Sequence, residues 1–242
     1  MSQTTAELFR DDAYARRCDV VVVDVVEHGV VLDQTVFYPK AGGQPGDTGQ
    51  LLIHEREPLD VVDTLWEDER LVHRLAEGTL PPAVGDRAEA LLDWPRRHRL
   101  MRMHSALHLL CKAVDAAVTG GQIGADRSRL DFAITGEVPG RDEVSATLCR
   151  WVAEDLPISH RWVDAAALDE QPDLVRTMSV KPPRTGGRVR LVAIEGVDLQ
   201  ACGGTHVART GEIGSLAVVK IESKGKLNRR FTIALTDDEP VS

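Results

Sequence analysis

The chain has few cysteines, no long apolar run and no excess of basic residues, and each absence excludes a class of protein. Its four cysteines are scattered without the spacing of a disulfide-rich scaffold, so we expect reduced thiols. The longest apolar run, Val20–Val26, is interrupted by Asp24 and is far shorter than the ~20 residues that a membrane-spanning helix needs. The N-terminus is polar and contains Asp11 and Asp12, unlike a secretory signal. These features predict a cytoplasmic protein without a membrane partner.

The first 93 residues contain short β-branched runs separated by turns rich in Gly and Pro, which is typical of a small barrel or sandwich. Pro95 suits a first helical position, and the stretch from Arg96 to Val118 contains neither Gly nor Pro. Apolar residues recur at spacings of three and four from Leu100 to Val114, which predicts a long helix that Gly120-Gly121 ends. Helices and antiparallel strands then interleave without βαβ order. We therefore predict an α+β fold, in which a small β-barrel-like N-terminal domain (1–93) precedes an α+β domain (94–242).

The patterns also give individual elements. In the first part we expect strands over 19–26, 29–34, 49–53, 59–65, 70–75 and 86–92. In the second part we expect a helix over 142–155, one or two short helices over 165–178, and strands over 129–134, 158–163, 188–194, 214–221 and 229–235.

Two pairs of residues have the types and the spacing of metal ligands. His104 and His108 lie four apart in the expected helix and therefore on the same face. Cys202 and His206 flank two adjacent glycines, which allow a tight loop. An isolated HxxxH pair is common by chance, and the second pair is what favours a site. One thiolate and three imidazoles suit tetrahedral Zn²⁺, so we expect one zinc ion per chain.

The net charge of −9 argues against a protein that coats nucleic acid non-specifically. Two local basic clusters nevertheless stand out, and each lies close in sequence to one of the candidate ligand pairs. Either cluster alone would be read as a solvated surface. Beside a candidate metal site on an acidic chain, they favour an anionic substrate. The clusters are Arg96, Arg97, Arg99 and Arg102, and Lys220, Lys224, Lys226, Arg229 and Arg230.

Four segments resemble, in order, the editing region of alanyl-tRNA synthetase. They are TVFYPKAGGQPGDTG, RRHRLMRMHSALHLL, GGQIGADRSRLDF and ACGGTHVARTGEIGSLAVVKIESKGKLNRRFTIAL. The resemblance covers roughly residues 19–235 and lacks the catalytic synthetase domain with its ATP motifs. The chain is thus similar to the free-standing AlaX-type trans-editing proteins, and no nucleotide cofactor is expected.

The resemblance implies a zinc-dependent aminoacyl-tRNA deacylase whose partner is mischarged tRNA(Ala). Ser-tRNA(Ala) is the chief expected substrate and Gly-tRNA(Ala) the second. A synthetase pocket discriminates weakly against a close analogue that adds a hydroxyl, so a second hydrolytic site is needed. Four protein ligands leave no vacant tetrahedral position. We therefore rank positioning of the substrate together with activation of water above direct attack from the metal.

The resemblance also suggests roles for individual residues. Gly42, Gly43 and Gln44 match its glycine-rich motif, which is expected near the editing pocket, although an ordinary loop would have the same residues. Gln122 matches a pocket glutamine. Asp47 and Asp198 are candidates to orient a ligand histidine, with a solvated carboxylate as the alternative. Lys224, Lys226, Arg229 and Arg230 are expected to contact tRNA phosphates.

This sequence departs from the family motifs at two places, and other functions stay open. Lys40-Ala41 replaces a short acidic or small residue and a third glycine, and Ala125 replaces a serine, which bears on the preference for serine or glycine. One alternative is a threonyl-type editing module acting on another mischarged tRNA. The other is a non-enzymatic, zinc-stabilised RNA-binding protein, since closed four-ligand sites are usually structural. No sequence feature specifies an oligomeric state.

Overall fold

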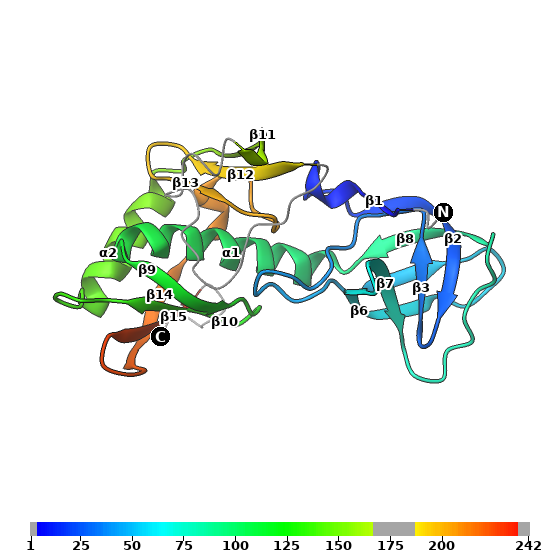
Figure 1. Cartoon of the computed structure of the whole chain (residues 1–242), viewed down its shortest axis with the longest axis horizontal. Coiled ribbons are helices and arrows are strands. Elements are labelled where there is room, and N and C mark those ends of the chain that lie inside the picture. The colour runs from blue at the N-terminus through cyan, green and yellow to red at the C-terminus, as the bar shows by residue number, and fades with distance from the viewer. Residues whose placement is uncertain (1–3, 167–186, 237–242) are drawn as a thin grey trace. The chain divides into compact units, whose positions relative to one another are not determined.

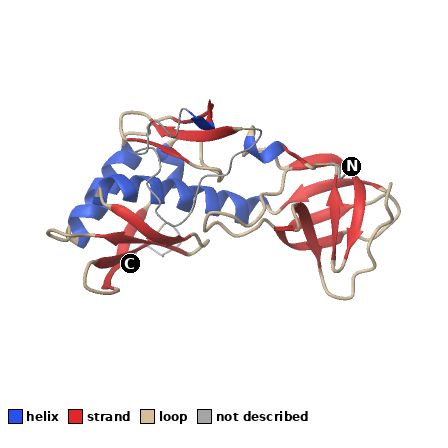
Figure 2. Ribbon diagram, viewed as in Figure 1, coloured by secondary structure: helices blue, strands red, loops and turns tan. Residues whose placement is uncertain are grey.

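The computed structural model describes residues 4–166 and 187–236, which form mainly β-structure with two α-helices (Figures 1 and 2). The chain divides into two compact units, Met1–Arg99 and Leu100–Ser242. The expected short helices over 165–178 fall almost entirely outside the described residues. Within the described residues, no helix is long and apolar enough to cross a membrane.

The first unit contains a closed barrel of six strands in the order β2-β3-β7-β6-β5-β8, with every neighbouring pair antiparallel. Branched aliphatic side chains alternate along these strands, so one face of each strand fills the barrel. All six strands coincide closely with those expected from the sequence. Their bounds are β2 Arg17–Val26, β3 Gly29–Leu32, β5 Gly49–Leu52, β6 Leu59–Glu67, β7 Arg70–Leu75 and β8 Arg87–Leu92.

Short elements precede and follow the first barrel hairpin. The strands β1 (Ala6–Glu7) and β4 (Gln34–Thr35) pair in parallel, and a 3₁₀ turn, η1 (Leu8–Arg10), follows β1. The segment after β4 buries Val36 and Phe37 in the barrel core. The glycine-rich turn therefore begins from a chain that is fixed by packing.

A buried ion pair holds the end of the glycine-rich segment against the first turns of α1 (Trp94–Val114). The Asp47 carboxylate accepts a hydrogen bond from Arg97 Nε at 2.9 Å, and the two side chains are 1% and 0% exposed. The guanidinium also donates to the Val36 carbonyl, and the same carboxylate accepts from the Tyr38 amide. Asp47 is thus neither a solvated carboxylate nor a partner of a histidine, contrary to both readings of the sequence.

The second unit has a four-stranded sheet, β14-β15-β10-β9, and a three-stranded sheet, β11-β12-β13, each antiparallel throughout. In the view of Figure 1 the two sheets are drawn on either side of α1. The bounds are β9 Ala117–Gln122, β10 Arg127–Ala133, α2 Arg141–Ala153, β11 Ile158–Asp164, β12 Arg188–Ile194, β13 Asp198–Ala201, the 3₁₀ turn η3 Thr210–Ile213, β14 Leu216–Ser223 and β15 Asn228–Leu235.

The predicted end of the long helix was wrong. The helix ends at Val114 because Asp115 adopts a left-handed conformation, with φ of 49°. Residues 117–122, including both glycines, then form β9, an edge strand that pairs with β10. The pairing with β10 outweighs the lack of Gly and Pro that had favoured helix up to Val118. The sequence patterns also gave no strand at β13.

Candidate metal centre

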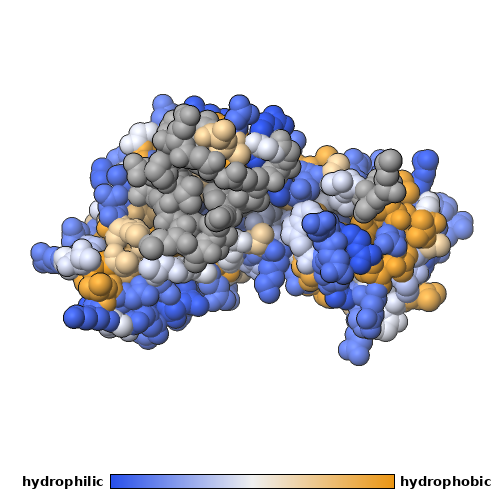
Figure 3. Space-filling view, in the orientation of Figure 1, coloured by the Kyte–Doolittle hydropathy of each residue, from blue (hydrophilic) through white to orange (hydrophobic). Residues whose placement is uncertain are grey.

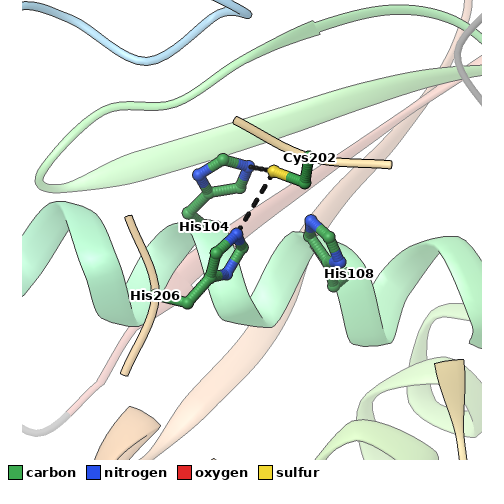
Figure 4. Close-up of side chains that lie close together, drawn as sticks. All are labelled: His104, His108, Cys202 and His206. Atoms are coloured by element: carbon green, nitrogen blue, oxygen red, sulfur yellow. Dashed lines mark hydrogen bonds between the residues drawn. The ribbon is translucent and has the colours of Figure 1, made fainter. Parts of the chain in front are cut away.

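Four side chains from two distant segments meet in the second unit. His104 and His108 project from one face of α1, as their spacing predicts. Cys202 directly follows β13, and His206 lies in the loop after it. The four side chains point toward one another (Figure 4), and their ligand atoms lie within 4.8 Å of one another. The cluster can therefore hold a metal ion.

The distances from the Cys202 sulfur to two of the histidine nitrogens fit tetrahedral coordination. Bonds of about 2.3 Å to sulfur and 2.0–2.1 Å to nitrogen would separate a thiolate from an imidazole nitrogen by about 3.5 Å. Cys202 Sγ lies 3.5 Å from His104 Nε2 and 3.3 Å from His206 Nε2. All three histidines are buried. Ring centroids of His104 and His206 are 4.2 Å apart, a close approach that a shared cation would stabilise.

Burial and the charges within the cluster shift the pKa values of three of its four side chains. Burial would raise the pKa of Cys202, but the positive charge of His104 and His206 holds it well below its usual value. Burial and the charge of His104 lower the pKa of His206 well below its usual value. Burial also opposes the charged form of His108, yet hydrogen bonds to Asp198 and Cys202 raise its pKa to about 9. The Cys202 thiolate and the neutral His206 imidazole are forms that bind metals, whereas a metal ion would have to displace a proton from His108.

The outward nitrogen of His108 has buried polar partners. Nδ1 lies 3.3 Å from Asp198 Oδ2 and 2.9 Å from Gln200 Nε2, and Gln200 also donates to Asp198 at 2.7 Å. A ring that binds a metal through Nε2 carries its proton on Nδ1, and Asp198 is the acceptor for that proton. In that tautomer Gln200 Nε2, which is itself a donor, bonds to Asp198 and not to the ring. Asp198 thus has the orienting position that was suggested for it. The contact of Gln200 with Asp198 could not be predicted from the sequence.

A buried arginine holds the loop that carries Cys202. Arg190 on β12 donates from Nη1 to the carbonyls of Cys202 (3.2 Å) and Gly204 (3.0 Å), and its own carbonyl accepts from the Cys202 amide. The Gly204 amide in turn lies 3.4 Å from Cys202 Sγ. Arg190 was not singled out from the sequence, because in an alternating strand it resembles an ordinary surface residue.

The helix α1 also contacts the loop that carries His206, through the side chain of Ser105. Ser105, next to His104, is fully buried. Its Oγ lies 3.2 Å from His206 Nδ1 and 3.2 Å from the Val207 amide nitrogen. No pattern in the sequence indicates this role for Ser105.

The glycine-rich motif forms a tight turn in the first unit. Ala41 and Gln44 exchange backbone hydrogen bonds of 3.1 and 2.9 Å. Gly42 and Gly43 between them both have positive φ, 57° and 85°, as the two central residues of a type I′ turn require. Gln44 itself is 1% exposed. The turn geometry alone explains both glycines, and a role near an editing pocket stays a prediction.

Gln122 does not belong to the metal cluster. It ends β9, is exposed, and accepts hydrogen bonds from Arg129 Nε and Nη2 at 3.3 and 3.2 Å. It lies opposite Arg129 in the register, on the face away from buried Leu130. Its role as a pocket residue stays a prediction.

The four expected RNA-contacting residues differ in their surroundings. Arg230 is bound by Asp131 at 2.7 and 2.8 Å, and Arg229 braces the β14–β15 turn through the Gly225 carbonyl. Lys224 Nζ lies 3.8 Å from Glu222, and Lys226 is exposed and forms no ion pair within the described part of the chain. In Figure 3 hydrophilic side chains predominate in the region of this hairpin, with hydrophobic ones among them. Of the four residues, Lys224 and Lys226 in the turn are therefore the most accessible to an anionic ligand.

Comparison with known proteins relates both units to aminoacyl-tRNA synthetases. Residues 189–232 match the family described as the threonyl and alanyl tRNA synthetase second additional domain. Residues 5–96 match the family of class II (A) tRNA synthetases. The first match includes Cys202, His206 and the basic hairpin.

Relatives of similar length match nearly the whole chain. The alanyl-tRNA editing protein AlaX-M of Methanosarcina acetivorans is 35% identical over 96% of this chain and 100% of its own length. AlaX-M of Methanosarcina mazei is 35% identical over 96% and 97%. An alanine–tRNA ligase of Halorubrum lacusprofundi is 36% identical over 90% of this chain but only 24% of the ligase. The chain therefore belongs to the AlaX-type family of alanyl-tRNA editing proteins.

Proposed function

We propose that this protein is a zinc-dependent aminoacyl-tRNA deacylase that removes serine from mischarged tRNA(Ala), with Gly-tRNA(Ala) as a second substrate. The observation that carries the proposal is the meeting of one cysteine and three histidines from α1 and the loop after β13, in a chain of the alanyl-tRNA editing family. The reaction is hydrolysis of the ester between the amino acid and the terminal ribose.

His104, His108, Cys202 and His206 would hold the zinc ion. The donor set supports this assignment, because three imidazoles and one thiolate suit tetrahedral zinc, and the thiolate sulfur lies 3.5 and 3.3 Å from two of the imidazole nitrogens. When bound, zinc supplies a Lewis acid that can orient a carbonyl group and favour attack by water.

The chain's own residues set the orientation of this site. Asp198 holds the Nδ1 proton of His108, and Arg190 fixes the carbonyls on both sides of the Cys202 loop. Buried partners of this kind limit rotation of the ligand side chains. A substrate ester would therefore meet ligands that need little rearrangement.

We infer that a polar group discriminates seryl from alanyl esters. Alanine is smaller than serine, so no pocket that admits serine can exclude it by size. A group that hydrogen-bonds the serine hydroxyl would be left without its partner by alanine, at a cost of roughly 1–3 kcal/mol. Gln44 and Gln122 are the first candidates, because an amide can both donate and accept.

We further propose that residues 1–93 and 94–242 act as two functional domains and that the β14–β15 turn contacts tRNA phosphates. Lys224 and Lys226 lead this proposal, because Asp131 already neutralises Arg230. Arg229 would act mainly by keeping the turn in shape. A cytoplasmic location stays a prediction.

Reversing both charges in the Lys224→Glu/Lys226→Glu variant should weaken tRNA binding and reduce its salt dependence. Each lost phosphate contact lowers the slope of log K against log[salt] by about 0.7–0.9, so two lost contacts should lower it by about 1.4–1.8. Binding is measured by titration of labelled tRNA at several salt concentrations. Lys112→Glu, which changes the same charge on α1, is the control. An unchanged slope in the double variant would remove this hairpin from the RNA interface.

Turnover of charged tRNA tests the function itself. Catalytic amounts of the protein should release serine from Ser-tRNA(Ala) over many turnovers. A protein that binds the tRNA without releasing serine would instead be a zinc-stabilised RNA-binding protein. Preference for Ser-tRNA(Thr) over Ser-tRNA(Ala) would indicate the threonyl-type alternative.

A further inference from the structure

We propose that Ser105 is a positioning residue that fixes His206 as an Nε2 ligand and attaches the His206 loop to α1. The inference rests on the proposed metal centre and goes beyond its four ligands. Ser105 lies between His104 and the rest of the cluster in sequence, but its side chain faces His206 and Val207, about a hundred residues further along the chain.

The two ring nitrogens of His206 face different partners. Nε2 lies 3.3 Å from Cys202 Sγ, inside the cluster, and Nδ1 lies 3.2 Å from Ser105 Oγ, outside it. A metal ion in the cluster takes the lone pair of Nε2, so the proton of the neutral ring must reside on Nδ1. Ser105 Oγ is then the acceptor of that proton.

The serine oxygen has the capacity for both contacts. A hydroxyl has two lone pairs and one proton. One lone pair accepts the Val207 amide, and the other accepts His206 Nδ1. Since Ser105 is fully buried, water cannot replace it without opening the packing around α1. Ring orientation and loop position are therefore coupled through one oxygen atom.

Among the described residues, the other side chains that hold the cluster act on different groups. Asp198 accepts from His108 and is itself held by Gln200, and Arg190 holds the carbonyls of Cys202 and Gly204. Each ties the cluster to the three-stranded sheet. Ser105 ties it to the helix that carries the other two histidines.

The test is the zinc affinity of Ser105→Ala, measured by competition with a chromophoric chelator. Loss of such a partner of a ligand histidine typically lowers metal affinity 10–100-fold, and we expect a loss in that range. Replacing zinc by Co²⁺ gives a second readout, because the visible absorption bands report ligand geometry and should shift in the variant. Ser105→Thr keeps the oxygen and should retain most of the affinity and the spectrum.

Ser145→Ala is the matched control. Ser145 on α2 also accepts a backbone amide from a distant segment, that of Val218 at 3.0 Å, but it contacts no histidine. It should leave zinc affinity unchanged. Equal affinities of wild type and Ser105→Ala, or equal losses in both alanine variants, would overturn the role of Ser105 while the metal centre stands. A wild-type protein that binds no stoichiometric zinc would overturn the metal centre as well.

Discussion

Cys202→Ala and His104→Ala are expected to lose most of the bound zinc and to slow hydrolysis of Ser-tRNA(Ala) on the order of a thousandfold. Each variant leaves three of the four ligands, so the ion loses one of its bonds and the remaining side chains lose a shared partner. Without the cation, the buried imidazoles and thiolate would have to balance their charges among themselves. Losing several kcal/mol of Lewis-acid stabilisation corresponds to about three orders of magnitude in rate.

Metal analysis of the purified variants and single-turnover deacylation check this prediction together. Cys149→Ala is the matched control, because Cys149 is an exposed cysteine on α2 outside the cluster. It should keep about one zinc per chain and the wild-type rate. Full zinc occupancy in Cys202→Ala and His104→Ala would mean that the ion binds elsewhere.

Asp47→Ala is expected to destabilise the first unit by about 3–5 kcal/mol, because it leaves the Arg97 charge buried without its partner. Arg97 is completely buried, and its other acceptors are neutral carbonyls, those of Val36 and Ala13. The variant also removes the acceptor of the Tyr38 amide, so the glycine-rich turn loses one of its anchors. Urea dependence of hydrogen exchange in the barrel strands measures the change.

Two further variants separate the buried charge from a general effect of substitution. The double variant Asp47→Ala/Arg97→Met removes both charges and should recover a large part of the lost stability. Glu89→Ala breaks the exposed pair between Glu89 and Arg17 and should cost less than about 1 kcal/mol. Similar losses in Asp47→Ala and Glu89→Ala would show that the buried pair contributes little.

The sequence predicted well that His104, His108, Cys202 and His206 would come together, because each pair obeys local rules. The spacing of four between His104 and His108 needs only a helix to bring both rings to one face, and the glycines after Cys202 need only a turn. The barrel strands followed from β-branched runs between turn residues. That the two ligand pairs meet depends on tertiary structure, and it was expected from the combination of ligand types rather than from any local signal.

The contacts around the cluster were not predictable in the same way. Ser105, Arg190 and Gln200 are common residue types whose roles depend on what lies opposite them after folding. Asp47 was assigned to a histidine or to solvent, because nothing local indicates that Arg97 lies beside it. The start of the strand β9 was read as the end of the helix, and the rest of the strand was not predicted, because its pairing with β10 is non-local.

The most direct test of the proposed function is the rate at which the protein deacylates Ser-tRNA(Ala), Gly-tRNA(Ala) and Ala-tRNA(Ala), measured side by side under the same conditions. An unpaired polar group costing roughly 1–3 kcal/mol predicts that the seryl ester is hydrolysed about ten to over a hundred times faster than the alanyl ester. Zinc removal with a chelator should abolish this hydrolysis, and added zinc should restore it. Equal rates for the seryl and alanyl esters, or hydrolysis that persists without zinc, would contradict the proposed function.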